Sequence, residues 1–118
     1  NTGLILTLAL SYGSRKEILE AVKKTAAKVR DGSLRLEDID FPEFESHLYT
    51  RDLPELDLLI RTSGEQRISN FLLYQIAYTE LHFTDVLWPD FKEDDLLKAI
   101  IDFQSRERRF GLIKEQIA

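Results

Sequence analysis

The sequence has 118 residues, of which 43% are hydrophobic and 31% charged, and its formal net charge is −5. This composition is typical of one globular domain, and the acidic balance excludes a nucleic-acid role that depends on overall positive charge. The absence of Cys excludes disulfides and thiolate chemistry. No apolar stretch approaches the roughly 20 residues of a spanning helix. We therefore expect at most peripheral membrane contact, and a cytoplasmic location.

The first part of the chain predicts a buried strand followed by a helix. Residues 4–10 form a nearly continuous apolar run, typical of a strand buried on both faces in a parallel sheet. Ser14 and Glu17 form a capping-box pattern at the start of a helix, which Gly32 is placed to end. A short helix is expected over residues 42–49, because Pro is tolerated at the first helical position.

The second part predicts two more strands and two helices. Residues 56–60 and 82–87 are expected as strands, and a polar loop over residues 61–67 follows the first of them. Residues 69–81 are expected as a helix, and residues 92–109 have a clear amphipathic pattern. The alternation indicates an α/β fold with a mainly parallel sheet flanked by helices. Three strands alone would leave exposed edges, so we expect part of the sheet to lie elsewhere.

Polar residues that suit a phosphate group follow the second predicted strand. Arg61 lies at its end, Gly64 lets the backbone turn, and Arg67 and Ser69 come next. Ligands bind beyond the carboxyl ends of parallel strands, where two guanidinium groups, a hydroxyl and the N–H groups of a helix start suit a diphosphate. Composition alone favours the alternative, in which both arginines are solvated loop residues paired with nearby glutamates.

Glu80 and His82 are further candidates. The carboxylate of Glu80 would suit a magnesium ion that bridges to phosphate oxygens, although a solvated Glu paired with an arginine is the favoured interpretation from composition. His82 fits a hydrogen-bonded structural residue better than a base. The sequence contains no dinucleotide fingerprint, Walker loop, nucleophile elbow or helical pair of His.

The segment from Arg61 to Glu80 resembles the signature of cis-prenyltransferases of the undecaprenyl diphosphate synthase type, which reads Arg-Thr-x-Gly-Glu-x-Arg-x-Ser-Asn-Phe and ends in Glu. Residues 88–91 (Trp-Pro-Asp-Phe) and 106–111 (Arg-Glu-Arg-Arg-Phe-Gly) are similar to later motifs of the same family. The resemblance implies that residues 1–118 are the C-terminal portion of a single domain and lack its N-terminal half. A start at Asn1 without any Met also suggests a fragment.

The resemblance implies roles for individual residues. The matched positions are Arg61, Arg67 and Ser69 for isopentenyl diphosphate, the loop acid Glu65 for catalysis, Glu80 for Mg²⁺, and Arg109 and Gly111 for a diphosphate site reached across a homodimer. Ser11 stands where family members often have Asn.

The implied reaction condenses isopentenyl diphosphate onto an allylic diphosphate, giving a long polyprenyl diphosphate such as undecaprenyl diphosphate, a lipid carrier for cell-wall synthesis. In the family, an Asp and a His-Gly-Asn-Gly-Arg loop hold the allylic diphosphate, and these 118 residues contain neither. We therefore expect the chain alone to be inactive. The alternative is a non-catalytic partner subunit of a heteromeric cis-prenyltransferase, against which the matched arginines argue.

Overall fold

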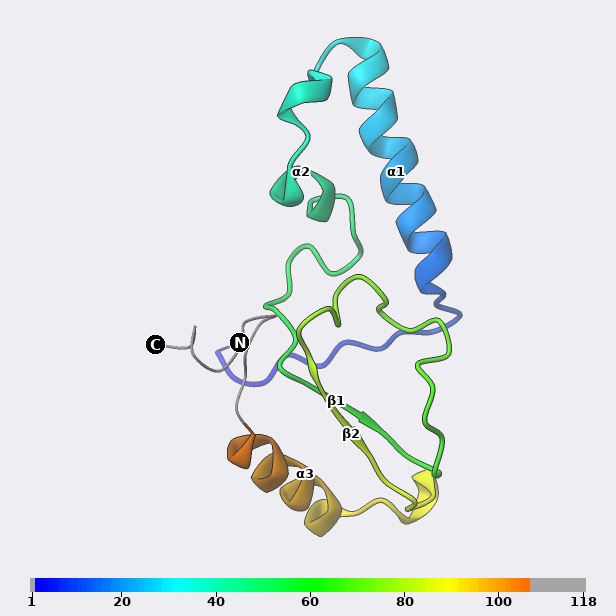
Figure 1. Cartoon of the computed structure of the whole chain (residues 1–118), viewed down its shortest axis with the longest axis vertical. Helices are drawn as coiled ribbons and strands as arrows, with labels where there is room; N and C mark the ends of the chain where they lie inside the picture. Colours follow the sequence, from blue (N-terminus) through cyan, green and yellow to red (C-terminus); the bar gives the residue numbers. More distant parts are fainter. Residues whose placement is uncertain (1, 107–118) are drawn as a thin grey trace. The chain divides into compact units, whose positions relative to one another are not determined.

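The computed structural model describes residues 2–106 (Figure 1). Its α-helices and strands are, in chain order, α1 (Ser14–Asp31), α2 (Phe41–Glu45), β1 (Leu58–Arg61), β2 (Glu80–Phe83) and α3 (Glu93–Ser105). The chain divides into two compact units, the first ending at Arg51 and the second beginning at Asp52. The first unit carries α1 and α2, and the second carries both strands and α3.

The start of α1 differs from the predicted capping box. Gly13 is the N-cap, in an extended conformation, so Ser14 is already the first helical residue. Glu17 is fully buried, and its carboxylate accepts hydrogen bonds from the hydroxyl of Tyr12 and from the backbone N–H of Tyr49 at 2.7 Å. The predicted cap was wrong because this carboxylate binds a segment 32 residues further along the chain.

The end of α1 agrees with the prediction. Gly32 has a φ of +86°, in the left-handed region that favours glycine, and its N–H donates to the carbonyl of Val29 at 3.2 Å. The predicted second helix is shorter than expected, because α2 ends at Glu45. It begins at Phe41, one residue before Pro42. Its N-cap is Asp40, whose side chain accepts a hydrogen bond from the backbone N–H of Glu43 at 2.9 Å.

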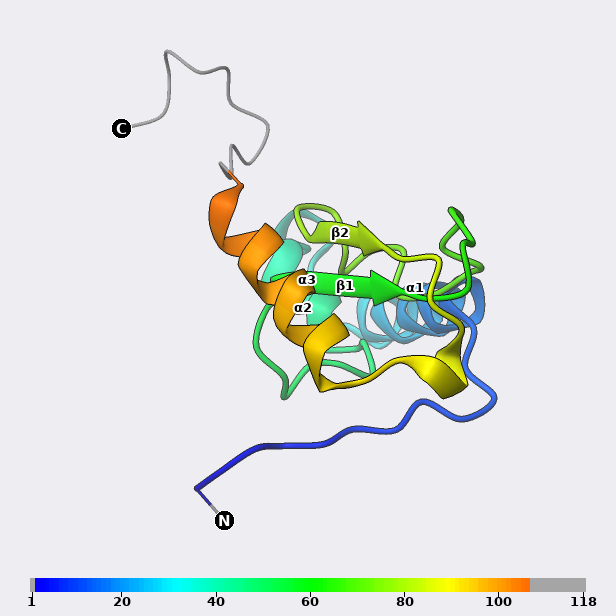
Figure 2. The same cartoon turned by 90° about the horizontal axis from the view of Figure 1, so that it is seen from below.

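The second unit is built on a small parallel sheet. β1 and β2 pair in parallel, with Leu58 opposite Glu80 and Arg61 opposite Phe83, and Figure 2 shows the two arrows pointing the same way. This confirms the predicted parallel α/β arrangement. α3 packs against β2 and contributes Ala99, which is fully buried. It ends at Ser105, and Arg106 is its C-cap. The helix predicted over residues 92–109 is therefore shorter at this end, and its residues 107–109 lie outside the described part.

Two predicted elements are absent from residues 2–106. Residues 4–10 are not a strand, and their large apolar side chains are between 72% and 89% exposed. A strand needs a hydrogen-bonding neighbour, and the described residues supply none for this run. Residues 69–79 form turns instead of a helix. Ser69, Asn70 and Leu72 have φ values of +54°, +62° and +49°, and the left-handed region is incompatible with a right-handed helix.

Across residues 2–106, the structure contains no helix with the length and apolar character needed to span a membrane.

Candidate functional site

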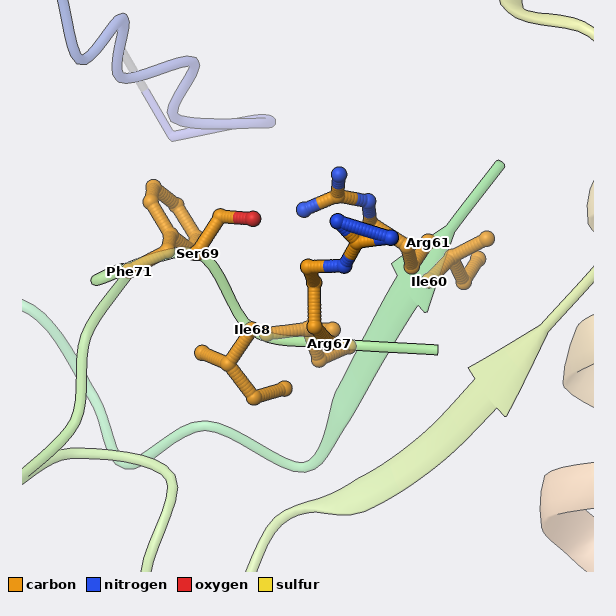
Figure 3. Close-up of a pocket in the computed structure, with 7 residues that line it drawn as sticks. Ile60, Arg61, Arg67, Ile68, Ser69 and Phe71 are labelled. Atoms are coloured by element: carbon orange, nitrogen blue, oxygen red, sulfur yellow. The ribbon is translucent and has the colours of Figure 1, made fainter. Parts of the chain in front are cut away.

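The carboxyl end of β1 and the loop that follows it line a hollow of about 300 Å³, at the small end of the range for ligand pockets. Its lining residues are Leu59, Ile60, Arg61, Arg67, Ile68, Ser69 and Phe71. The guanidinium groups of Arg61 and Arg67 and the hydroxyl of Ser69 point toward the same space (Figure 3). The structure thus brings together the three residues that the sequence predicted for a diphosphate.

The two arginines differ in their surroundings. Arg61 is half-buried, and its guanidinium has no hydrogen-bond or ion-pair partner within the described part of the chain. Arg67 is 71% exposed, with Nη2 2.7 Å from Oε2 of Glu65. The interpretation from composition therefore holds for Arg67, which is solvated and paired with a glutamate. Exposed ion pairs contribute little free energy, so an anionic ligand can compete with Glu65 for this guanidinium.

The backbone of the site is strained at several positions. Ser63 and Gly64 both have a φ of +68°, and Ser69 and Asn70 follow at +54° and +62°. Left-handed conformations are uncommon outside Gly, and they gather at sites where the surrounding structure holds them. Here the N–H of Gly64 donates to the carbonyl of Thr84 at 2.9 Å, so the loop is tied to the segment that follows β2.

The apolar part of the lining was missed in the sequence. Ile68 and Phe71 flank Ser69 and Asn70, and we expected a helix to start at residue 69. The predicted helix began after Ile68, whereas the observed turns place Ile68, Ser69 and Phe71 at one hollow. The signal that could have found them is the mixture of bulky apolar and small polar residues directly after a polar loop that contains Ser63 and Gly64.

Glu80 lies at the opposite end of the sheet from Arg61. It begins β2 opposite Leu58, the first residue of β1. Since a strand rises about 3.3 Å per residue, the backbone positions of Glu80 and Arg61 are about 10 Å apart along the sheet. The carboxylate Oε2 of Glu80 lies 3.2 Å from Nη1 of Arg106. The predicted pairing of Glu80 with an arginine is therefore confirmed.

Arg106 joins α3 to β2 through several acceptors. Besides Glu80, its Nη1 donates to the carbonyl of Leu81 at 2.7 Å, and its Nη2 donates to Oδ2 of Asp102 at 2.6 Å. Nδ1 of His82 lies 3.1 Å from the same Asp102 oxygen, which confirms His82 as a hydrogen-bonded residue. The hydrogen bonds from His82 and then Arg106 lower the pKa of Asp102 below its ordinary value.

The residues of this second cluster do not form a magnesium site in their present arrangement. Within residues 2–106, no group of three or more His, Cys, Asp or Glu side chains is placed to hold a metal ion. Mg²⁺ commonly uses one or two carboxylates together with phosphate oxygens, but the carboxylate of Glu80 is bound to Arg106, at the other end of the sheet from the arginine pair. Arg109 and Gly111 lie outside the described residues.

Comparison with known proteins gives consistent matches. Residues 1–111 match the family model described as "Putative undecaprenyl diphosphate synthase". An isoprenyl transferase of Porphyromonas gingivalis is 58% identical over 118 residues, which is all of this chain and 46% of the relative. A "Ditrans,polycis-undecaprenyl-diphosphate synthase ((2E,6E)-farnesyl-diphosphate specific)" of Vibrio parahaemolyticus is 52% identical over 117 residues, covering 99% of this chain and 47% of the relative.

A solved structure is also similar. The crystal structure of lavandulyl diphosphate synthase from Lavandula x intermedia, in complex with dimethylallyl diphosphate, matches with a TM-score of 0.81 and 50% sequence identity. The match covers 86% of this chain and 44% of that protein. The chain thus spans about half the length of the relatives that it matches.

Proposed function

Because the chain belongs to the undecaprenyl diphosphate synthase family of cis-prenyltransferases, we propose that it is the C-terminal portion of a single domain that lengthens isoprenoid diphosphates. The reaction joins isopentenyl diphosphate to an allylic diphosphate and produces a long polyprenyl diphosphate such as undecaprenyl diphosphate. The gathering of Arg61, Arg67 and Ser69 at one hollow is the observation that carries the proposal, because two guanidinium groups and a hydroxyl together suit a diphosphate.

In this site, the arginines bind the diphosphate of isopentenyl diphosphate. The guanidinium of Arg61 is half-buried and unpaired within residues 2–106, so it offers the stronger electrostatic attraction. Arg67 exchanges its contact with Glu65 for phosphate oxygens, and the hydroxyl of Ser69 donates a further hydrogen bond. Ile68 and Phe71 form an apolar wall against which the five-carbon chain can lie. Holding the substrate in this way presents its double bond to the allylic carbon.

The remaining roles are proposed from the family resemblance. Glu65 is proposed as a catalytic loop acid, and its contact with Arg67 supports a position beside the diphosphate. Mg²⁺ held by Glu80 and a homodimer contact through Arg109 and Gly111 are also proposed. To hold Mg²⁺, the carboxylate of Glu80 would have to leave its contact with Arg106. The chain alone is proposed to be inactive, because the position for the allylic diphosphate needs residues beyond these 118.

A non-catalytic partner subunit is the other function that this family resemblance suggested. Such a subunit has no need of a cationic hollow, so the convergence of Arg61 and Arg67 favours the catalytic role.

The first test is the affinity of the intact protein that contains this sequence for isopentenyl diphosphate, measured by titration calorimetry. Arg67→Ala should weaken binding about 10- to 100-fold, because a hydrogen bond to a charged group contributes roughly 1.5–3 kcal/mol. Arg35→Ala is a matched control, because Arg35 is also exposed and lies 3.5 Å from a glutamate two residues away in the sequence. Equal affinities for the two variants would overturn the proposed function.

A further inference from the structure

The loop of residues 61–67, which we call the arginine loop, is held by a short segment that directly follows β2. We call this segment the brace (Thr84–Val86). The N–H of Thr84 donates to the carbonyl of Arg61 at 2.9 Å. In return, the N–H of Gly64 donates to the carbonyl of Thr84 at 2.9 Å, and the N–H of Ser63 donates to the carbonyl of Val86 at 2.8 Å. These bonds continue the parallel pairing past Arg61 and Phe83, the last residues of the two strands.

The brace has a side-chain element of its own. The hydroxyl of Thr84 accepts a hydrogen bond from the N–H of Val86 at 3.3 Å and so closes a turn two residues long. This turn sets the direction of the Val86 carbonyl, which accepts from Ser63. The conformation of the loop therefore depends on a hydroxyl that does not line the hollow itself.

A steric contact supports the same arrangement. Gly64 has a φ of +68°, and a Cβ placed on it would lie 3.0 Å from Oδ1 of Asp85, the central residue of the brace. The loop therefore approaches the brace so closely that the Asp85 carboxylate occupies the space next to Gly64. A side chain at position 64 would meet both the unfavourable φ and this carboxylate.

The hydrogen bonds of the brace also limit which groups of the loop can bind an anion. The N–H groups of Ser63 and Gly64 belong to consecutive residues in left-handed conformations, and consecutive N–H groups in turns can form a cradle for an anion. Both groups already donate to carbonyls of the brace. Binding at this loop therefore relies on the side chains of Arg61 and Arg67, whose placement the brace controls.

We infer that Thr84 is a positioning residue for the diphosphate site. Its hydroxyl orders the brace, and the brace fixes the loop on which the two arginines stand. This inference rests on the proposed function, since it assigns the residue that arranges the same site. Loss of the hydroxyl should loosen the loop and weaken diphosphate binding, while a substrate that has bound should still react.

The experiment compares Thr84→Val with Thr84→Ser in the intact protein. Val keeps the shape but removes the acceptor, whereas Ser keeps the hydroxyl. We expect Thr84→Val to raise the Kd for inorganic diphosphate and the KM for isopentenyl diphosphate about 3- to 10-fold, the range for one neutral hydrogen bond. The kcat should stay within about twofold, and Thr84→Ser should behave like the unaltered protein.

A second pair of variants covers the case in which Thr84→Val does not fold. Gly64→Ala should weaken diphosphate binding about 10-fold, because both the φ and the Asp85 contact oppose a Cβ there. Gly32→Ala is the control, because Gly32 has a φ of +86° with no atom within 4 Å of its Cβ position and lies far along the chain from the loop. It should leave binding unchanged.

The outcomes separate this inference from the proposed function. If the unaltered protein binds diphosphate but Thr84→Val matches Thr84→Ser, or Gly64→Ala matches Gly32→Ala, the positioning role is overturned and the proposed function stands. If the unaltered protein binds neither inorganic diphosphate nor isopentenyl diphosphate, the proposed function fails and the positioning role fails with it.

Discussion

The β1–β2 sheet has a cationic group at each end, and the two are satisfied in different ways. At the carboxyl end, Arg61 has no side-chain partner among residues 2–106, and Arg67 has only an exposed contact with Glu65. At the amino end, Arg106 is 33% exposed and bonds to Glu80, to Asp102 and to a backbone carbonyl. An arginine that bonds to several protein acceptors holds structure together, whereas one without such bonds is available to a ligand.

The backbone conformation also differs between the two ends of the sheet. Left-handed φ values occur at Ser63, Gly64, Ser69 and Asn70, all close to the carboxyl end. No such residue occurs in β2 or α3, which carry the cluster around Arg106 at the amino end. Strained backbone persists where surrounding bonds hold it, and it is frequent at ligand sites. The arginine loop therefore combines two independent features of a binding site, and the Arg106 cluster has neither.

The largest effects are expected from a comparison of two alanine variants, one at Arg61 and one at Arg106. Arg61→Ala should weaken the binding of isopentenyl diphosphate about 10- to 100-fold and leave α3 as stable as before. Arg106→Ala should leave binding within about twofold, but lower the free energy of local unfolding of α3 by about 1–2 kcal/mol, because several acceptors lose their donor. Titration calorimetry and amide hydrogen exchange report the two effects. The contrast breaks down if Arg106→Ala weakens binding as much as Arg61→Ala does.

A second test uses acid. Because the folded state lowers the pKa of Asp102 below its ordinary value of about 3.9, the ionised carboxylate stabilises the contact between α3 and β2 above that pH. This stabilisation should be lost as the pH falls below about 4 and through the lowered pKa. Hydrogen exchange of α3 amides, corrected for intrinsic rates, should show protection that declines in this window.

Asp102→Asn provides the control for that measurement. Its α3 amides should be less protected at neutral pH and should change less on acidification, because the variant has no carboxylate to protonate at this position. A decline of the same size in the variant would show that other groups cause it.

The smallest expected effect on diphosphate affinity comes from a change at Glu65. Glu65→Gln removes the exposed partner of Arg67, so we expect diphosphate affinity to rise by no more than about twofold, with unchanged stability. The proposed catalytic role of Glu65 predicts in addition that kcat falls clearly. A variant with unchanged kcat would leave Glu65 as a companion of Arg67 and remove it from the catalytic residues.

The site was predictable where its parts are adjacent in the sequence. Arg61, Arg67 and Ser69 lie within nine residues after a recognisable strand, so the carboxyl-end rule for parallel sheets was enough to group them. The brace was not predictable, because its bonds to the loop cross from residues 63 and 64 to residues 84 and 86. Nothing in the local pattern of Thr84-Asp-Val indicates which carbonyls those N–H groups reach.

Sequence patterns were enough to predict the parallel strands, the family, the glycine at the end of α1 and the identity of the arginine pair. These depend on local preferences or on residues close together in the chain. Three outcomes became visible in the folded structure: residues 4–10 do not form a strand within the described chain, residues 69–79 turn instead of forming a helix, and Glu80 contacts Arg106. The Glu80 contact joins residues that are 26 positions apart, and residues 4–10 have no pairing strand within the described part of the chain. Local sequence patterns indicate neither, because both depend on which distant groups satisfy the hydrogen bonds of backbone and charged side chains.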